Sequence, residues 1–185
     1  MSQPAIAPHR GFTLIEVMFA VAIVAVLCAV SMPSLAALMS STRAHSTQNT
    51  LVTALNTARM TAVSRQSEIV LCPSSDQSNC DNTFWWQQGW IVFEDLDHDG
   101  KRTSNEPILS VTQSQPHMAI ATTAGREHVT YRTDGSATGT NLTFTLCDRR
   151  GPKHASTVVI NNAGRARHAP ATPDEAAAAC AGLPQ

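Results

Sequence analysis

FTLIEVMFAVAIVAVLCAVSM, residues 12–32, is the stretch that decides the fold: only Thr13, Glu16 and Ser31 interrupt its apolar residues. As a helix this stretch would be about 30 Å long, which is the thickness of the hydrocarbon core of a bilayer. It therefore predicts a membrane-spanning helix. A secretory signal peptide would carry its cleavage site after the apolar run, whereas here the small residue Gly11 precedes it. The Glu16 carboxylate is costly inside a membrane unless it is paired or lies near the interface.

The rest of the sequence has the composition of a soluble domain. Its 185 residues allow one domain with an appendage. The formal net charge of −1 and the 15% of charged residues exclude a globally basic nucleic-acid-binding protein and a highly charged disordered chain. The charge is unevenly spread, because residues 68–106 carry eight acids against two bases, whereas residues 126–168 carry seven bases against three acids. A local basic surface is therefore compatible with the neutral average.

The residues at the start of the apolar run carry a family resemblance. Gly11-Phe-Thr-Leu-Ile-Glu16 resembles the leader junction of type IV pilins and type II secretion pseudopilins. The resemblance implies that a prepilin peptidase cleaves after Gly11, removing residues 1–11, and that Phe12 is N-methylated. It also implies that Glu16 pairs with the terminal amine of a neighbouring pilin, which fits the need of a buried carboxylate for a cation. The protein would then cross the inner membrane once, with its globular domain in the periplasm, before it enters an extracellular pilus filament.

A second helical pattern follows the apolar run, over residues 33–66. Pro33 predicts a kink or a softened helix, because proline removes a backbone donor. Apolar residues at helical spacing then predict an amphipathic half that packs on a sheet: Leu51, Leu55, Ala58 and Ala62. We expect one helix over roughly 12–66, since a separate coiled coil would need longer heptads.

Short β-prone runs split by turn residues predict a β-rich domain over residues 67–169. Because no helical pattern separates these runs, we expect antiparallel sheets and an α+β fold. The predicted strands are 68–72, 89–94, 107–112, 118–122, 129–133, 142–147 and 157–161. In the tail, 170–185, Thr172 and Glu175 form a capping box that predicts a short helix.

Two segments of the β-rich region carry a second resemblance. Residues 86–95, WQQGWIVFED, and residues 106–109, EPIL, are similar to the GspH/FimT branch of type IV minor pilins and pseudopilins. The resemblance implies a pilin-like fold, with a long N-terminal helix packed on antiparallel sheets, and a low-abundance filament subunit. Trp85, Trp86 and Trp90 could stack on nucleic-acid bases. Beside an apolar strand, however, we expect them in the core.

Five cysteines are present, and Cys28 lies in the apolar helix, where it acts as a small hydrophobe. The other four could pair in three ways, and an oxidising periplasm would favour disulfides. The pairing closest in sequence joins Cys72 to Cys80 and Cys147 to Cys180. A zinc site is not expected, because no C-x-x-C pair exists.

One loop fits the D-x-D-x-D-G-x5-E pattern of calcium loops. Its ligands would be Asp95, Asp97, Asp99, the Lys101 carbonyl and Glu106. A polar hairpin explains the same residues and is favoured, because a predicted strand precedes the loop and Arg102 stands where calcium loops are usually apolar. The sequence contains no motif of a hydrolase, P-loop, dinucleotide or zinc-protease site, so it predicts neither an enzyme nor a cofactor.

A basic segment, Gly164-Arg-Ala-Arg-His168, follows the last predicted strand. Alternate residues of an extended segment project to one side, so Arg165 and Arg167 could bind phosphate as a pair. A solvated basic edge that deters strand pairing is the alternative.

The G-R-x-R pattern resembles the DNA-binding motif of FimT minor pilins in naturally transformable bacteria. The resemblance implies a DNA-binding role for Gly164, Arg165 and Arg167. Arg149, Arg150 and Lys153 lie nearby in the sequence, and we expect them to help grip the phosphate backbone. The predicted function is therefore a minor pilin that captures extracellular DNA without reading its sequence. The alternative is a minor pilin that primes pilus assembly, or a type II secretion pseudopilin, without DNA binding.

Overall fold

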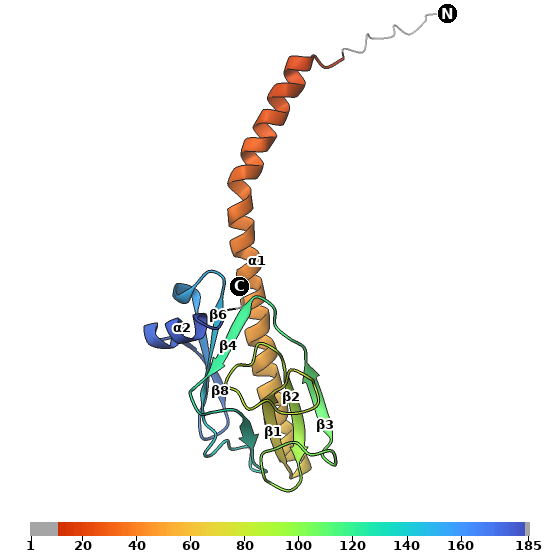
Figure 1. The fold of residues 1–185 in the computed structure, drawn as a ribbon, viewed down its shortest axis with the longest axis vertical. Coiled ribbons are helices and arrows are strands. Elements are labelled where there is room, and N and C mark those ends of the chain that lie inside the picture. Colours follow the sequence, from red (N-terminus) through yellow and green to blue (C-terminus); the bar gives the residue numbers. More distant parts are fainter. Residues whose placement is uncertain (1–10, 184–185) are drawn as a thin grey trace, which may run out of the picture. The chain divides into compact units, whose positions relative to one another are not determined.

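The computed structural model describes residues 11–183. Residues 1–10, which the sequence assigns to the leader, lie outside the described residues. The structure confirms the α+β fold, with one long helix and two antiparallel sheets (Figure 1). Helix α1 spans Leu14–Arg65, close to the predicted 12–66, and its helical assignment continues through position 33. The chain divides into two compact units, of which one ends at Met39 and the other begins at Ser40.

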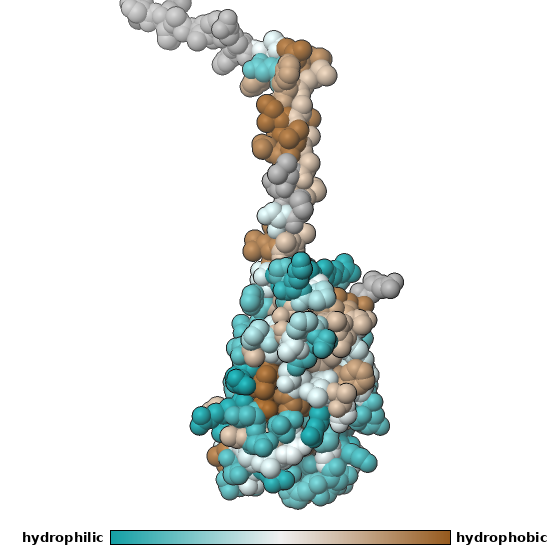
Figure 2. Space-filling view, turned by 90° about the vertical axis from the view of Figure 1, so that its left-hand side faces the viewer, coloured by the Kyte–Doolittle hydropathy of each residue, from teal (hydrophilic) through white to brown (hydrophobic). Residues whose placement is uncertain are grey.

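The first unit is the apolar part of α1. Its large apolar side chains are exposed, for example those of Phe19 and Leu27. Figure 2 shows hydrophobic residues in brown along this part of the helix. This helix is long and apolar enough to cross a membrane. Cys28 lies in this part of α1, exposed and outside both disulfides.

The second unit contains two four-stranded sheets. Sheet A has the order β3-β2-β1-β5, from Ile108–Thr112, Trp90–Asp95, Glu68–Pro73 and Val129–Tyr131. Sheet B has the order β4-β6-β7-β8, from Met118–Thr122, Thr143–Asp148, Ser156–Ile160 and Ala166–Pro170. A short 3-10 helix η1, Pro152–His154, connects β6 to β7. Helix α2, Pro173–Cys180, is the last element of the described residues.

Two strand predictions differ from the structure. The predicted strand 129–133 ends earlier, at Tyr131, because Arg132 begins a turn in which the Gly135 N–H donates to the Arg132 carbonyl. Strand β8 was not predicted at all. Its sequence, ARHAP, contains charged residues and a proline, which are rare inside strands, and it forms because it pairs antiparallel with β7.

The main core lies between α1 and the inner faces of both sheets. Leu51, Leu55, Ala58 and Ala62 of α1 are buried there, as the helical spacing predicted. Trp86 and Trp90 are fully buried in the same cluster, which places them in the core and not on a surface that could stack on bases.

Each outer sheet face is covered by a segment that a disulfide holds. On sheet A, Cys80 packs on Val70 and Phe93, and the Cys72–Cys80 bond closes the loop. On sheet B, α2 packs on Ala119 and Ala121, and the Cys147–Cys180 bond ties its end to β6. Helix α2 begins with the capping box that the sequence indicates: the Glu175 N–H donates to Thr172 Oγ1, and the Thr172 N–H donates to Glu175 Oε2.

Candidate functional site

The basic segment of the sequence forms the turn and the edge strand of the β7–β8 hairpin. The Asn161 N–H donates to the Arg165 carbonyl, and the Gly164 N–H donates to the Asn161 carbonyl at 2.8 Å. The Arg165 N–H also donates to Asn161 Oδ1 at 3.0 Å. These bonds fix the backbone of Arg165 at the point where β8 begins.

Gly164 has a structural role in this turn. Its φ of +74° is left-handed, and a Cβ at this position would overlap the carbonyl oxygen of Gly135. The same Gly135 carbonyl accepts a hydrogen bond from Arg59 Nε at 2.9 Å. Gly164 is buried against the chain itself, so the packing of the turn explains the glycine at this position.

Arg165 and Arg167 lie on one face of sheet B. Arg167 stands opposite Val159 and Arg165 opposite Asn161, which places both on the outer face, the face that α2 covers further along. Residues two apart in a strand are separated by about 7 Å. Both side chains are exposed, and within residues 11–183 neither forms an ion pair. The pair of guanidinium groups is therefore open to a ligand with several negative charges.

The structure does not bring the other three predicted basic residues to this pair. Arg149, Arg150 and Lys153 follow the end of β6, beside Ser156, whereas Arg167 lies opposite Val159 near the other end of β7. The five residues of β7 span about 17 Å. Arg150 is also engaged, because its guanidinium contacts the buried Asp148 carboxylate at 2.7 Å. The basic residues therefore form two separate surfaces.

Sequence reasoning missed two arginines near the hairpin. Arg59 of α1 lies against the turn, 3.1 Å from the Cβ position of Gly164. Arg132 shares its turn with Gly135, the residue that contacts Gly164. Strands β1–β7 separate Arg59 from Arg165 in the sequence, and β6 and β7 separate Arg132 from it, so only the tertiary fold reveals their proximity.

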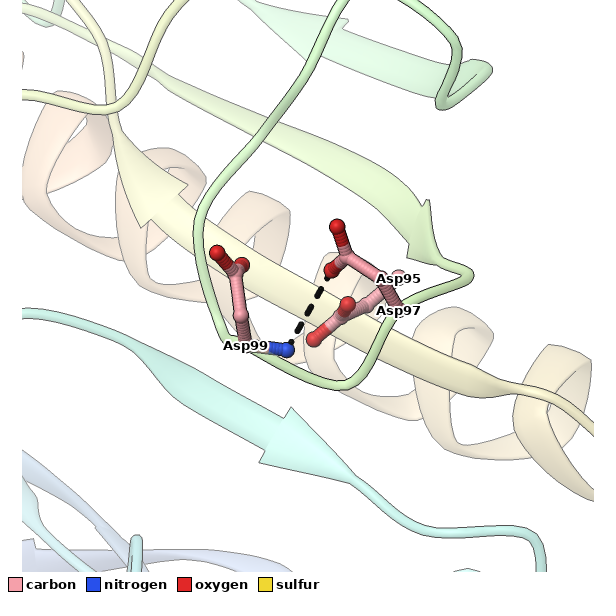
Figure 3. Close-up of side chains that lie close together, drawn as sticks. All are labelled: Asp95, Asp97 and Asp99. Carbon is pink, nitrogen blue, oxygen red and sulfur yellow. Dashed lines mark hydrogen bonds between the residues drawn. The ribbon is translucent and has the colours of Figure 1, made fainter.

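The candidate calcium loop connects β2 to β3, and its three aspartates gather around one turn (Figure 3). Asp95 is buried and accepts the N–H groups of His98 and Gly100 at 2.8 and 2.9 Å. Glu106 is buried too and accepts those of Leu96 and Thr103. In Figure 3 the dashed line marks the Asp99 N–H bond to Asp97 Oδ1. Backbone amides bond to these carboxylates and close the loop as a hairpin; Lys101 is exposed.

The two buried carboxylates of this loop differ in the direction of their pKa shifts. Burial raises the pKa of Asp95, and the amides of Gly100 and His98 offset only part of that effect. Burial acts on Glu106 in the same direction, but the N–H groups of Thr103 and Leu96 outweigh it and lower the pKa of Glu106. The loop therefore stabilises the charged form of the Glu106 carboxylate.

At the start of the described chain, the predicted processing and assembly residues lie on exposed backbone. Gly11 has no heavy atom near its Cβ position, and the Phe12 side chain is exposed. The Glu16 N–H donates to Thr13 Oγ1 at 3.3 Å in the first turn of α1.

Comparisons with known proteins identify the class that this fold defines, namely the type IV pilins and pseudopilins. The prokaryotic N-terminal methylation motif matches residues 7–32, and the family of the type II transport protein GspH matches residues 47–164. The chain therefore belongs to the GspH family, and it is a minor pilin or pseudopilin of a type IV pilus or a type II secretion system. Processing by a prepilin peptidase and association with other pilins follow from this membership, as does anchoring by the apolar helix. The family and the fold are those of structural components of such filaments.

Solved structures share this fold. The type IV minor pilin FimU of Pseudomonas aeruginosa is 20% identical, with a TM-score of 0.55 over 74% of this chain and 98% of FimU. The minor pseudopilin EpsH of the Vibrio cholerae type 2 secretion system is 11% identical, with a TM-score of 0.50 over 69% of this chain and 97% of EpsH. At these identities the likeness shows the fold alone. No curated protein matches the sequence.

Proposed function

We propose that this minor pilin binds extracellular DNA through the outer face of β8, and that a pilus carrying it takes DNA to the cell during natural transformation. One observation carries the proposal: Arg165, directly before β8, and Arg167, within it, are both exposed, and no carboxylate of the described residues is paired to them. Guanidinium groups bind phosphate in a bidentate manner. Their spacing of about 7 Å allows each to contact a different phosphate.

Such a site grips the backbone of DNA without reading the bases. Phosphate contacts fix position but carry no sequence information. Few contacts give weak binding that depends strongly on salt, with a slope of about −0.9 in log K against log salt for each phosphate neutralised. The hydrogen bonds of the hairpin would hold the backbone of the two arginines in place before DNA arrives, so that binding has to order only their side chains.

A salt titration of duplex DNA binding tests the proposal, with the full chain in neutral detergent. In Arg165→Ala/Arg167→Ala we expect at least a tenfold loss of affinity at low salt, and a slope that is smaller by about 1.8 because two phosphate contacts are gone. The matched control is Arg65→Ala/Lys101→Ala, which removes the same charge from the sheet A side and should bind nearly as the parent does. Equal binding by the Arg165/Arg167 variant and the parent would refute the assigned site.

A purely structural role is the second candidate, and the match to the GspH family favours it. In that case the functional residues are Gly11, Phe12 and Glu16, with cleavage after Gly11, methylation of Phe12 and pairing of Glu16 with a neighbouring pilin. Mass spectrometry of the mature N-terminus tests the first two steps. A strain that lacks the protein separates the two candidates: intact piliation with lost transformation indicates DNA capture, whereas lost piliation indicates assembly.

A further inference from the structure

A second basic surface lies where β6 ends, away from the Arg165/Arg167 pair. Its charged members are Arg149 and Lys153, to which α1 adds Arg43, and we call these three residues the Arg149 surface. All three side chains are exposed, and within the described chain none of them forms an ion pair. The proposed DNA site does not use this surface.

Hydrogen-bonding side chains surround Arg149. It borders a hollow of about 270 Å³ together with Gln87, Gln88, Ser114, Gln115, Pro116 and His117. Thr47 Oγ1 donates to Gln115 Oε1 at 3.0 Å, which ties this hollow to α1 four residues after Arg43. The hollow therefore offers amide, hydroxyl and guanidinium donors together, which suits a phosphate group.

Positive charge is not balanced at this end of the globular unit. The four segments that meet here, residues 43–48, 84–90, 113–117 and 149–155, contain no Asp or Glu but include His45, His117 and His154. Asp148, just before them, neutralises only Arg150. The loop that carries Asp76 and Asp81 comes close to residues 113–117 on the sheet A side, because the side-chain amides of Gln77 and Gln113 form hydrogen bonds with each other. The net positive charge therefore lies on the sheet B side.

Chain connectivity keeps this surface close to the membrane. The sequence carries no charged residue between Glu16 and Arg43, and exposed apolar side chains of α1 continue to Met39. A helix needs about 20 residues to cross the hydrocarbon core. The membrane-spanning segment that starts near Glu16 therefore ends at Met39 or a few residues before it. Arg43 follows Met39 by only four residues in the same helix, so the headgroup layer is within reach of its long side chain.

We propose that the Arg149 surface binds anionic phospholipid headgroups while the subunit is still anchored in the membrane. Anionic surfaces attract basic residues within about a Debye length of 10 Å, and each Lys or Arg strengthens the association by about fivefold. DNA fits this surface less well, because the same anionic membrane repels it. This inference rests on the membrane anchor and is independent of the DNA-binding proposal.

The chain offers a direct reporter for this contact, because Lys101 and Lys153 are its only lysines. Lys153 belongs to the proposed surface, whereas Lys101 lies in the β2–β3 loop, beyond the end of β2 that pairs with Glu68. Both are exposed. The full chain is reconstituted into phosphatidylcholine vesicles with or without phosphatidylglycerol and treated briefly with a membrane-impermeant amine reagent. Mass spectrometry then gives the ratio of Lys153 to Lys101 labelling.

We expect phosphatidylglycerol to lower this ratio at least threefold, and high salt to restore it. Arg43→Gln/Arg149→Gln should weaken the effect while it keeps Lys153 as the reporter, and Arg165→Gln/Arg167→Gln, which changes the same charge, should leave it intact. An unchanged ratio in phosphatidylglycerol would overturn the inference. The inference would also be overturned if duplex DNA lowered the labelling ratio in phosphatidylcholine vesicles while phosphatidylglycerol did not lower it. That outcome would assign the surface to DNA.

Discussion

Gly164 shows how a single residue can look functional and be structural. It begins the G-R-x-R pattern, yet its left-handed φ and its contact with the Gly135 carbonyl explain why glycine stands there. The glycine acts on the arginines through the hairpin: it lets the turn pack on Gly135 and Arg59, and so fixes where β8 starts. In this chain the pattern therefore combines one glycine that shapes the backbone with two side chains that face solvent.

Gly164→Ala should destabilise the protein by about 2–4 kcal/mol, since it adds left-handed strain and a steric overlap. Urea unfolding followed by tryptophan fluorescence measures the loss. Gly125→Ala is the matched control, because Gly125 has a similar φ of +76° and no heavy atom within 4 Å of its Cβ position. It should cost only about 1 kcal/mol. Equal losses in the two variants would show that the contact with Gly135 contributes nothing.

Glu106 is the residue on which the β2–β3 loop depends. Glu106→Ala leaves two N–H groups, those of Leu96 and Thr103, without their acceptor, and should cost about 2 kcal/mol. The pKa of Glu106 is lowered in the folded state, so its stabilisation is present above its ordinary pKa of 4.5 and is lost as the pH falls through the folded value. The difference in unfolding free energy between the parent and Glu106→Gln should therefore shrink in acid. Asp97→Ala, at an exposed carboxylate, should change little; a pH-independent difference for Glu106→Gln would contradict this account.

At the scale of elements, two disulfide-held segments cover the outer faces of the two sheets. The Cys147–Cys180 bond spans 33 residues and holds α2 on sheet B, whereas Cys72–Cys80 spans 8 residues on sheet A. A disulfide stabilises mainly by restricting the unfolded chain, and more so for a longer loop. Helix α2 has only 8 residues, too few to be stable without such support.

Removing each disulfide by Cys→Ser substitution at both positions should therefore have unequal effects. Loss of Cys147–Cys180 should lower the free energy of unfolding by about 4 kcal/mol, and loss of Cys72–Cys80 by about 2.5 kcal/mol. Urea denaturation of the two double variants measures the difference. The reverse order would mean that the loop over sheet A contributes more by packing than by chain restriction.

Most elements could be predicted because their patterns are local. The apolar run, the α1 face at Leu51 and Leu55, and the capping box at Thr172 each need only a few neighbouring residues. Strand β8 could not be predicted, since its ARHAP sequence has no strand pattern and depends on the pairing of Val159 with Arg167. For the same reason the sequence predicted one basic site where the structure has two, because only the pairing of β8 with β7 shows that Arg167 lies at the end of β7 away from Lys153.

For the whole molecule, the net charge of −1 hides a division by location. Sheet A carries the acidic β2–β3 loop, while sheet B carries Arg165 and Arg167 near one end of β7 and Arg149 and Lys153 near the other. The two basic surfaces lie on the same sheet and are separated by the length of β7. A neutral chain can thus carry two distinct basic surfaces.

The interactions that stabilise the fold are concentrated in the second of the two units. Every buried residue of the three hydrophobic clusters lies at or after Leu51, the partly buried residues packed on them begin at Ala44, and both disulfides lie beyond Ser40. Among the described residues up to Met39, none belongs to this core. Residues 40–185 should therefore fold alone, with a cooperative thermal transition and a midpoint within a few degrees of that of the full chain in detergent. Near-ultraviolet circular dichroism reports the buried Trp86 and Trp90, and a fragment that lacks this signal would show that the apolar half of α1 is needed for the core to form.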